Sequence, residues 1–262
     1  MAERVFAQID AFASKAFAGN QACIVPMAGF EDDAVLQAIA AENNVAETAF
    51  IVPAGEHRWQ LRWFTPTIEV PLCGHATLAS AHWLYAHDGF AGDQIVFETR
   101  QSGELYVRQM GSGELEMDFP APTVTDLPPN PALTKALGAE PSALYGGPFV
   151  AAIFETAEEI RALQPDLTAI AEIAEVGCMA FDGDGVDVTS RFFAPGAGIP
   201  EDPATGSWHC MVAAIAGPRF HRALSCYQAF PGRGANLKVE LVGDRVKLRG
   251  RCVTVIEGVL RY

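Results

Sequence analysis

Short segments in which apolar and polar residues alternate recur along the chain. Residues 58–64 and 186–192 show this alternation clearly, and it is typical of a strand that buries one face. Pro66 and Pro195 follow these segments and are expected to end the strands, because proline cannot donate a hydrogen bond to a sheet. Further strands are expected at residues 4–13, 48–53, 94–99, 103–110, 114–119, 148–154, 236–242, 245–249 and 252–257.

Two other segments are apolar on nearly all sides and predict buried helices. They cover residues 75–86 and 207–216. The first is expected to end near Gly89 and the second at Gly217-Pro218, since both residues disfavour a continuing helix. A helix-like stretch also covers residues 31–43. Buried helices flanked by many short strands predict an α+β protein.

One sequence motif, called the repeated phrase below, occurs twice, and its two copies lie about half the chain apart. Residues 62–75 contain Arg-Trp-Phe-Thr-Pro and then Glu-Val-Pro-Leu-Cys-Gly-His, while residues 191–207 contain Arg-Phe-Phe-Ala-Pro and then Glu-Asp-Pro-Ala-Thr-Gly-Ser. A motif that repeats after half the chain predicts two duplicated domains related by a pseudo-twofold axis. We expect residues 1–120 with 251–262 to form one domain and residues 121–250 the other. The alternative is a single α+β domain in which the phrases agree by coincidence.

Each copy of the phrase ends where a predicted buried helix begins, at Gly74 and at Gly206. The first amides of a helix have no partner within it and carry partial positive charge. If the two helix starts meet between the domains, they form a binding site for an anion. The alternative is that both glycines only cap their helices.

Charge and composition exclude some classes of function. The chain has 262 residues and a formal net charge of −14, which disfavours nucleic acid and anionic membranes as partners. No apolar run approaches the ~18 residues of a membrane span, and no signal peptide is recognisable, so we expect a cytoplasmic protein. The six scattered cysteines are then expected to be reduced thiols.

Motifs spread over the chain carry a family resemblance. They are Asp10-Ala11-Phe12 with residues 17–25, residues 42–50, 62–66, 72–77, 187–195 and 201–207, and Gln228 with Gly232-Arg233. In these motifs the chain resembles the phenazine-biosynthesis PhzF-like family, which has the diaminopimelate-epimerase-like fold. The resemblance implies two similar domains, each a mostly antiparallel β-barrel-like sheet around a central helix, with the active site in the cleft between them.

The resemblance also implies an isomerase that needs neither a metal nor an organic cofactor. The family's characterised member shifts a hydrogen on a dihydro-hydroxyanthranilate. By resemblance Glu47 carries the proton, assisted by His75 and Asp202. We expect burial and the charge of Asp202 to raise the pKa of Glu47, and the helix start to keep His75 neutral.

The substrate implied by the resemblance is a small carboxylate, cyclic substrates included. Its binding residues are expected to be Asn20, Cys73, Gly74, Gly206 and Ser207. The resemblance further implies a homodimer.

Two departures from the family pattern, Trp208 and Ala229, are positioned to reshape the pocket. Cys73 supports a different chemistry, an epimerase or dehydratase in which this thiol is the base. Racemases of this fold use a cysteine in both repeats, and here Thr205 occupies the second position. A non-catalytic protein that binds small acids is a third alternative.

Overall fold

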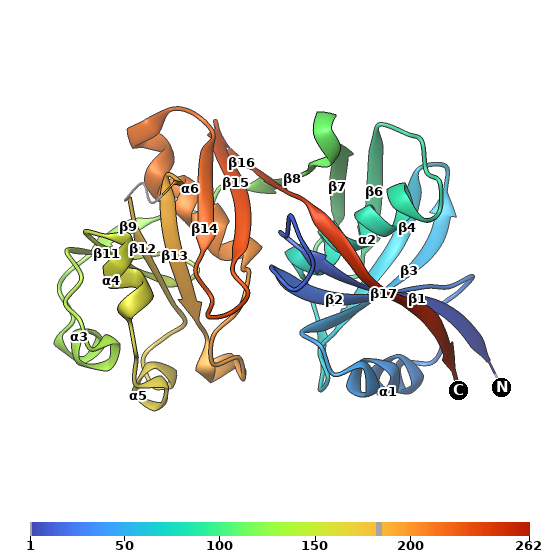
Figure 1. Cartoon of the computed structure of the whole chain (residues 1–262), viewed down its shortest axis with the longest axis horizontal. Coiled ribbons are helices and arrows are strands. Elements are labelled where there is room, and N and C mark those ends of the chain that lie inside the picture. Colours follow the sequence, from blue (N-terminus) through green and yellow to red (C-terminus); the bar gives the residue numbers. More distant parts are fainter. Residues whose placement is uncertain (1, 182–184) are drawn as a thin grey trace. The chain divides into compact units, whose positions relative to one another are not determined.

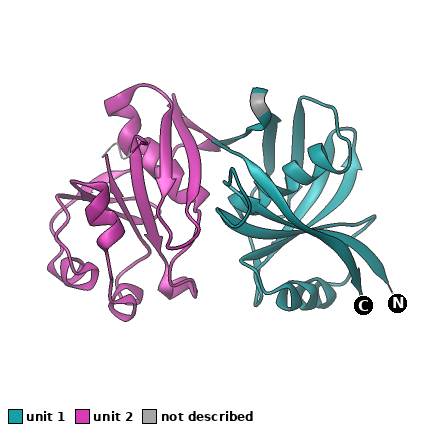
Figure 2. Ribbon diagram, in the orientation of Figure 1, with its two compact units in different colours: residues 1–118, 249–262 teal, residues 119–248 magenta. Residues whose placement is uncertain are grey.

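The protein folds into two compact units, which Figure 2 colours separately. The structure is a computed structural model and describes residues 2–181 and 185–262. Unit 1 comprises residues 1–118 and 249–262, and unit 2 comprises residues 119–248. The chain therefore leaves unit 1 once and returns to it for the last strand.

Unit 1 is a mixed sheet with two helices. Its strands are β1 (Glu3–Ala11), β2 (Asn20–Pro26), β3 (Glu47–Gly55), β4 (Arg58–Phe64), β5 (Glu69–Val70), β6 (Gln94–Thr99), β7 (Glu104–Gln109), β8 (Leu115–Pro120) and β17 (Cys252–Arg261). Its helices are α1 (Asp33–Asn43) and α2 (Gly74–Ala86), with a short 3₁₀ turn at Gly111–Gly113. The strands pair in the order β17-β1-β2-β3-β4-β6-β7-β8, and only β2/β3 and β4/β6 are parallel.

Unit 2 repeats this plan. Its strands are β9 (Thr125–Leu127), β10 (Ala143–Gly146), β11 (Val150–Phe154), β12 (Val176–Ala180), β13 (Val188–Phe193), β14 (Leu224–Gln228), β15 (Ala235–Val242) and β16 (Arg245–Gly250). Its helices are α3 (Pro131–Leu137), α4 (Ala157–Ala162), α5 (Leu167–Ala171) and α6 (Gly206–Phe220), with a 3₁₀ turn at Pro195–Ala197. The order β9-β10-β11-β12-β13-β14-β15 has its two parallel pairs, β11/β12 and β13/β14, at the same places as in unit 1.

A helix covers each face of the sheet in unit 1. Helix α2 packs against β1, β2, β3 and β17 (Figure 1), while α1 closes a second core cluster around Leu36 and Phe50. Strand β3 is therefore buried along its first six residues. Small residues let α2 approach the strands closely, and its buried hydroxyls at Thr77 and Ser80 bond back to the carbonyls of Cys73 and Ala76.

The central helix of unit 2, α6, is longer than the pattern predicts. The prediction that it ends at Gly217-Pro218 is wrong, because the helix continues to Phe220 and ends at His221 in a left-handed conformation with φ of 50°. The amide of His221 donates to the Gly217 carbonyl over 2.9 Å. A side chain at Gly217 would collide with Leu241 on β15, so tight packing holds the helix past the proline. In the described part of the chain, no helix has the length and apolar character to cross a membrane.

Candidate active site

Glu47 is the first residue of β3, where the chain enters the sheet from α1. Helix α1 ends at Asn44, whose left-handed φ of 50° turns the chain back towards the sheet. Strand β3 then runs parallel to β2, and Glu47 pairs with Ala22 in the register. The Glu47 residue is 8% exposed. A carboxylate so deeply placed at a strand start needs a partner for its charge.

His75 supplies that partner from the first turn of α2. Its Nε2 atom lies 3.0 Å from Oε2 of Glu47. This Oε2 atom is buried, and its contact with the imidazole is an ion pair at close range. The amide nitrogen of Asn20, at the start of β2, lies 3.3 Å from Nδ1 on the other side of the ring. Two buried neighbours thus hold the imidazole in place.

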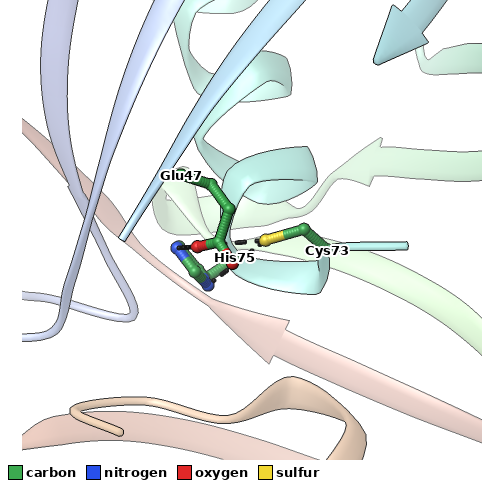
Figure 3. A group of neighbouring side chains, drawn as sticks. All are labelled: Glu47, Cys73 and His75. Atoms are coloured by element: carbon green, nitrogen blue, oxygen red, sulfur yellow. Dashed lines mark hydrogen bonds and ion pairs between the residues drawn. The ribbon is translucent and has the colours of Figure 1, made fainter. Parts of the chain in front are cut away.

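Cys73 completes the group from the position just before α2. Its Sγ atom lies 3.5 Å from Nδ1 and 3.9 Å from Nε2 of His75, and it also forms a hydrogen bond with the Glu47 side chain. Figure 3 shows the three side chains converging on one point. One donor atom from each of Glu47, Cys73 and His75 lies within 4.8 Å of the others, which is close enough for the three to hold a metal ion.

The charges in this group differ from the expectation. Burial is the largest influence on the Glu47 carboxyl and raises its pKa, but the charge of His75 and hydrogen bonds from His75 and Cys73 outweigh burial, so the pKa is lowered. Burial lowers the pKa of His75, but Cys73 and Glu47 outweigh it and raise that pKa well above its usual value. The predictions of a raised pKa for Glu47 and a neutral His75 are therefore wrong, because the attraction between the two side chains, together with Cys73, outweighs burial.

The thiol of Cys73 is protonated near neutral pH. Burial raises its pKa to about 11, with Glu47 adding to the rise and His75 opposing it. A thiol of this kind is a poor base, because only the thiolate is reactive.

In unit 2, Asp202 belongs to a network that holds the loop before α6. Its Oδ2 atom accepts a hydrogen bond of 2.5 Å from the Thr205 hydroxyl. The fully buried side chain of Gln228 accepts from the Thr205 amide over 2.9 Å and donates to the Asp202 carbonyl over 2.6 Å. The sequence contained Gln228 in a motif but offered no sign of this bracing role.

Gly206 and Ser207 are the first two residues of α6, and Ser207 is exposed. The side chain of Thr205 does not cap this helix. By contrast, the three short helices of unit 2 each have a side-chain cap, at Asn130, Thr156 and Asp166. Helix α2 in unit 1 resembles α6, since Cys73 in the position before Gly74 provides no side-chain cap either. Helices α2 and α6 therefore share a start without a side-chain cap.

The repeated phrase has a structural reason. In unit 1, Arg62 makes a two-pronged ion pair with Glu69, with N–O distances of 2.7 and 2.8 Å. In unit 2, Arg191 does the same with Glu201 at the same distances. Both arginines are almost fully buried. Each pair ties the end of a strand to the loop that leads into the central helix, and so fixes the helix start.

Both departures from the family pattern, Trp208 and Ala229, lie in unit 2. Trp208 is fully buried in unit 2, where its ring packs against Phe192 and over Gly177. A side chain at Gly177 would lie 2.4 Å from the Trp208 ring, so this glycine makes room for the tryptophan. The amide of Ala229 donates to the Ser190 carbonyl over 2.7 Å. Trp208 is therefore part of the core of unit 2.

The structure gathers the predicted residues into two groups, one in each unit. Unit 1 brings together Glu47, His75, Cys73 and Asn20, with Gly74 between the cysteine and the histidine. Unit 2 brings together Asp202, Thr205 and the helix start at 206–207.

Known proteins share both the sequence and the fold. The family described as phenazine biosynthesis-like protein matches residues 9–258. An uncharacterized isomerase of Pseudomonas aeruginosa is 39% identical over 258 residues, which are 98% of each chain. A crystal structure of a PhzF-family phenazine biosynthesis protein from Enterococcus faecalis has a TM-score of 0.95 and 34% identity over 100% of both chains. A predicted epimerase of Pseudomonas aeruginosa, 24% identical over 98% of this chain and 99% of its own, shares the fold with a TM-score of 0.76. These likenesses confirm the expected fold class.

Proposed function

Since the chain belongs to the phenazine biosynthesis-like family and is an isomerase, we propose that it moves a proton on a small carboxylate substrate without a cofactor, with Glu47 as the general acid and base. The observation that carries this proposal is the buried pair of Glu47 and His75, 3.0 Å apart. The substrates in question include cyclic carboxylates.

The charged pair suits a group that takes a proton and returns it. Glu47 starts as a carboxylate and can accept a proton from a carbon of the substrate. Once protonated it stands next to the imidazolium of His75, which lowers the pKa of the carboxyl. The proton therefore returns readily to another carbon on the same face of the substrate. His75 keeps the Glu47 carboxylate in position through the ion pair, and it stabilises the polar group of the substrate that reacts.

The weak basicity of Glu47 must be offset by stabilising the negative charge on the substrate. We assign this role to the amides at Gly74, Gly206 and Ser207, which bind the substrate carboxylate and the charge that develops on it. The support is that α2 and α6 begin without a side-chain cap. Asp202 is proposed to contact the reacting substrate, while Cys73 and Asn20 line the substrate's position in unit 1.

The amides also explain how a strongly acidic protein can bind an anion. The formal net charge is −14, so the mean field repels a carboxylate. Backbone amides at two helix starts give a local positive potential that does not require lysine or arginine.

The alternative reaction is epimerisation or dehydration with Cys73 as the base. Its thiol touches both Glu47 and His75, which favours a part in the chemistry. Its pKa of about 11 and the threonine at 205 argue against it as the principal base. A non-catalytic binder is the second alternative.

Solvent deuterium incorporation into a panel of hydroxy- and amino-acid-like carboxylates tests the proposal. The wild type is expected to exchange a carbon-bound hydrogen of at least one compound. Glu47→Gln should lose that exchange, whereas Cys73→Ser should keep most of it. Loss in Cys73→Ser with exchange retained in Glu47→Gln would transfer the chemistry to the cysteine. Binding with no exchange in the wild type would identify a binder.

A further inference from the structure

The group formed by Glu47, Cys73 and His75 contains three different metal-binding atoms. They are a carboxylate oxygen, a sulfur and an imidazole nitrogen, all from buried or nearly buried residues. The His75 Nε2 atom is the centre of the group, 3.0 Å from Glu47 Oε2 and 3.9 Å from Cys73 Sγ. The buried Oε2 atom belongs to a carboxylate, whose oxygens have lone pairs for a metal ion once the proton on His75 Nε2 is released.

These two distances are close to the ligand–ligand distances around one small cation. Bonds from Zn²⁺ to nitrogen and oxygen are ~2.0–2.2 Å and to sulfur ~2.3 Å, so tetrahedral ligands stand roughly 3.3–3.8 Å apart. The two distances from Nε2 lie just outside this range on either side. The ligand atoms of all three side chains lie within 4.8 Å of one another, so the side chains must draw together around the ion to bring every atom to bonding distance.

From this geometry we propose that Glu47, Cys73 and His75 bind a soft divalent cation of the zinc class, which reversibly blocks the site. Thiolate and imidazole select such ions over Mg²⁺ and Ca²⁺, which prefer oxygen. Three protein ligands leave the fourth position for water or a substrate carboxylate.

Binding of the cation exchanges protons for metal bonds. The thiol proton of Cys73 and the proton shared by Glu47 and His75 pass to solvent, and the M²⁺ ion takes their place. No electron is transferred. The blocking effect rests on the proposed function, because the metal occupies the lone pairs that would carry the substrate proton. The binding itself does not depend on that function.

Cobalt provides a spectroscopic test that does not require turnover. The full-length protein, reduced and freed of metals with a chelator, is titrated with Co²⁺ and then with Zn²⁺. We expect one Co²⁺ per chain, intense tetrahedral d–d bands and a sulfur-to-cobalt charge-transfer band, all removed by an equivalent of Zn²⁺. Absence of the charge-transfer band in the wild type overturns the proposal, whatever the variants do.

Matched variants identify the ligands. Cys73→Ser should abolish the charge-transfer band and weaken Zn²⁺ binding at least 10-fold, while Cys23→Ser, at a buried cysteine on β2, should leave both unchanged. His87→Gln controls for a histidine pair at the opposite end of α2, where His82 and His87 both contact Thr254. Loss of binding in His87→Gln but not in Cys73→Ser would move the metal to that pair and overturn the assignment.

The effect on activity is measured separately. Stoichiometric Zn²⁺ should stop deuterium exchange by the wild type, and a chelator should restore it. Exchange that continues with the cobalt bands present refutes blocking but not binding. If no substrate exchanges at all, the proposed function fails while the cobalt spectrum still decides the metal site.

Discussion

The two units share a framework but differ in the chemistry that they place on it. The register pairs Thr48 with Phe64 in unit 1 and Val176 with Phe193 in unit 2, so Glu47 corresponds to Glu175. Glu47 is 8% exposed and pairs with a histidine, whereas Glu175 is only partly buried. At the matching position of the central helix, unit 2 has Ser207 in place of His75.

The framework itself is preserved through its arginine–glutamate pairs. Arg62 and Arg191 each bind a glutamate in the segment between a strand end and the central helix, and each also contacts the crossover between two parallel strands. The third contact differs, since Arg62 reaches Asp33 at the start of α1 and Arg191 donates to the carbonyls of Ile160 and Leu163 at the end of α4. A duplicated scaffold can thus keep its arginine–glutamate pairs while the buried glutamate–histidine pair of unit 1 has no counterpart at the matching positions of unit 2.

The largest expected effect separates the two glutamates. Glu47→Gln should reduce exchange or turnover by ~10²–10⁴-fold, the usual cost of losing general acid–base help. Glu175→Gln should change the rate less than twofold if only unit 1 carries the chemistry, although both variants remove one carboxylate from a strand start. The readout is the initial rate of deuterium incorporation. Comparable losses in both variants would mean that the proposed asymmetry between the units is mistaken.

The second effect concerns the two arginines. Arg191→Met should lower the free energy of unfolding by ~3–5 kcal/mol, because it leaves the Glu201 carboxylate buried without a partner. Arg62→Met should lower the free energy of unfolding by less, because the side chain of Glu69 is 24% exposed whereas that of Glu201 is 14% exposed. Urea denaturation followed by circular dichroism measures both.

Arg261→Met is the control for these variants. Arg261 and Glu3 form an exposed ion pair, and such pairs contribute ~0–1 kcal/mol. An equal loss of stability in all three variants would mean that burial of the ion pairs is not what makes them important.

The third effect tests a difference in core volume. The small residue Ala76 of α2 corresponds to Trp208 of α6, and Ala49 of β3 corresponds to Gly177 of β12. Gly177→Ala should lower the free energy of unfolding by ~1–3 kcal/mol, because the added methyl group overpacks the core against the Trp208 ring. Trp208→Phe in the same chain should recover part of that loss, because it shortens the ring system.

A double-mutant cycle on Gly177 and Trp208 measures the coupling by thermal or urea unfolding. Additive losses would show that the glycine is not there to accommodate the tryptophan. Ala49→Gly makes the reverse change at the matching position of unit 1. It should lower the free energy of unfolding by no more than ~1 kcal/mol.

The smallest effect is the dependence of stability on pH that the pair of Glu47 and His75 in unit 1 contributes. The pKa of Glu47 is lowered on folding from 4.5, so its contribution is present above that value and is lost as the pH falls. The pKa of His75 is raised from 6.5, so its contribution is fully present below that value and is lost as the pH rises. The stability difference between wild type and His75→Gln should therefore be largest between pH 4.5 and 6.5. Ser207→Ala in unit 2 should give a difference that does not vary with pH.

Much of the fold could be predicted from the sequence, because its strongest signals are local. The buried helices α2 and α6 are apolar all round, and the repeated phrase reflects an ion pair that both units need. The short helices α3, α4 and α5 were missed, although Asn130-Pro131, the Thr156–Glu159 capping box and Asp166 mark their starts. Helices of five to seven residues are too short to show a period.

The candidate site was only partly predictable. Glu47, His75 and Asn20 were identified through a motif, but their charges depend on distances that no spacing in the sequence reveals. The pKa directions of Glu47 and His75 are set by their contact across 28 positions of the chain, together with Cys73. The bracing of Thr205 by Gln228 likewise depends on how β14 lies beside the loop before α6.

Strand β17 follows all of unit 2 in the chain, yet it pairs with β1 from Glu3↔Arg261 to Ala11↔Cys252. During synthesis on the ribosome, unit 2 is therefore complete before unit 1 receives its last strand. Until then β1 has an open edge, and the loop that must close to pair it spans nearly the whole chain. Unit 1, which holds the Glu47 and His75 pair, is thus expected to be the later unit to mature in the cell, and this pair reaches its native surroundings only after unit 2 has had the chance to fold.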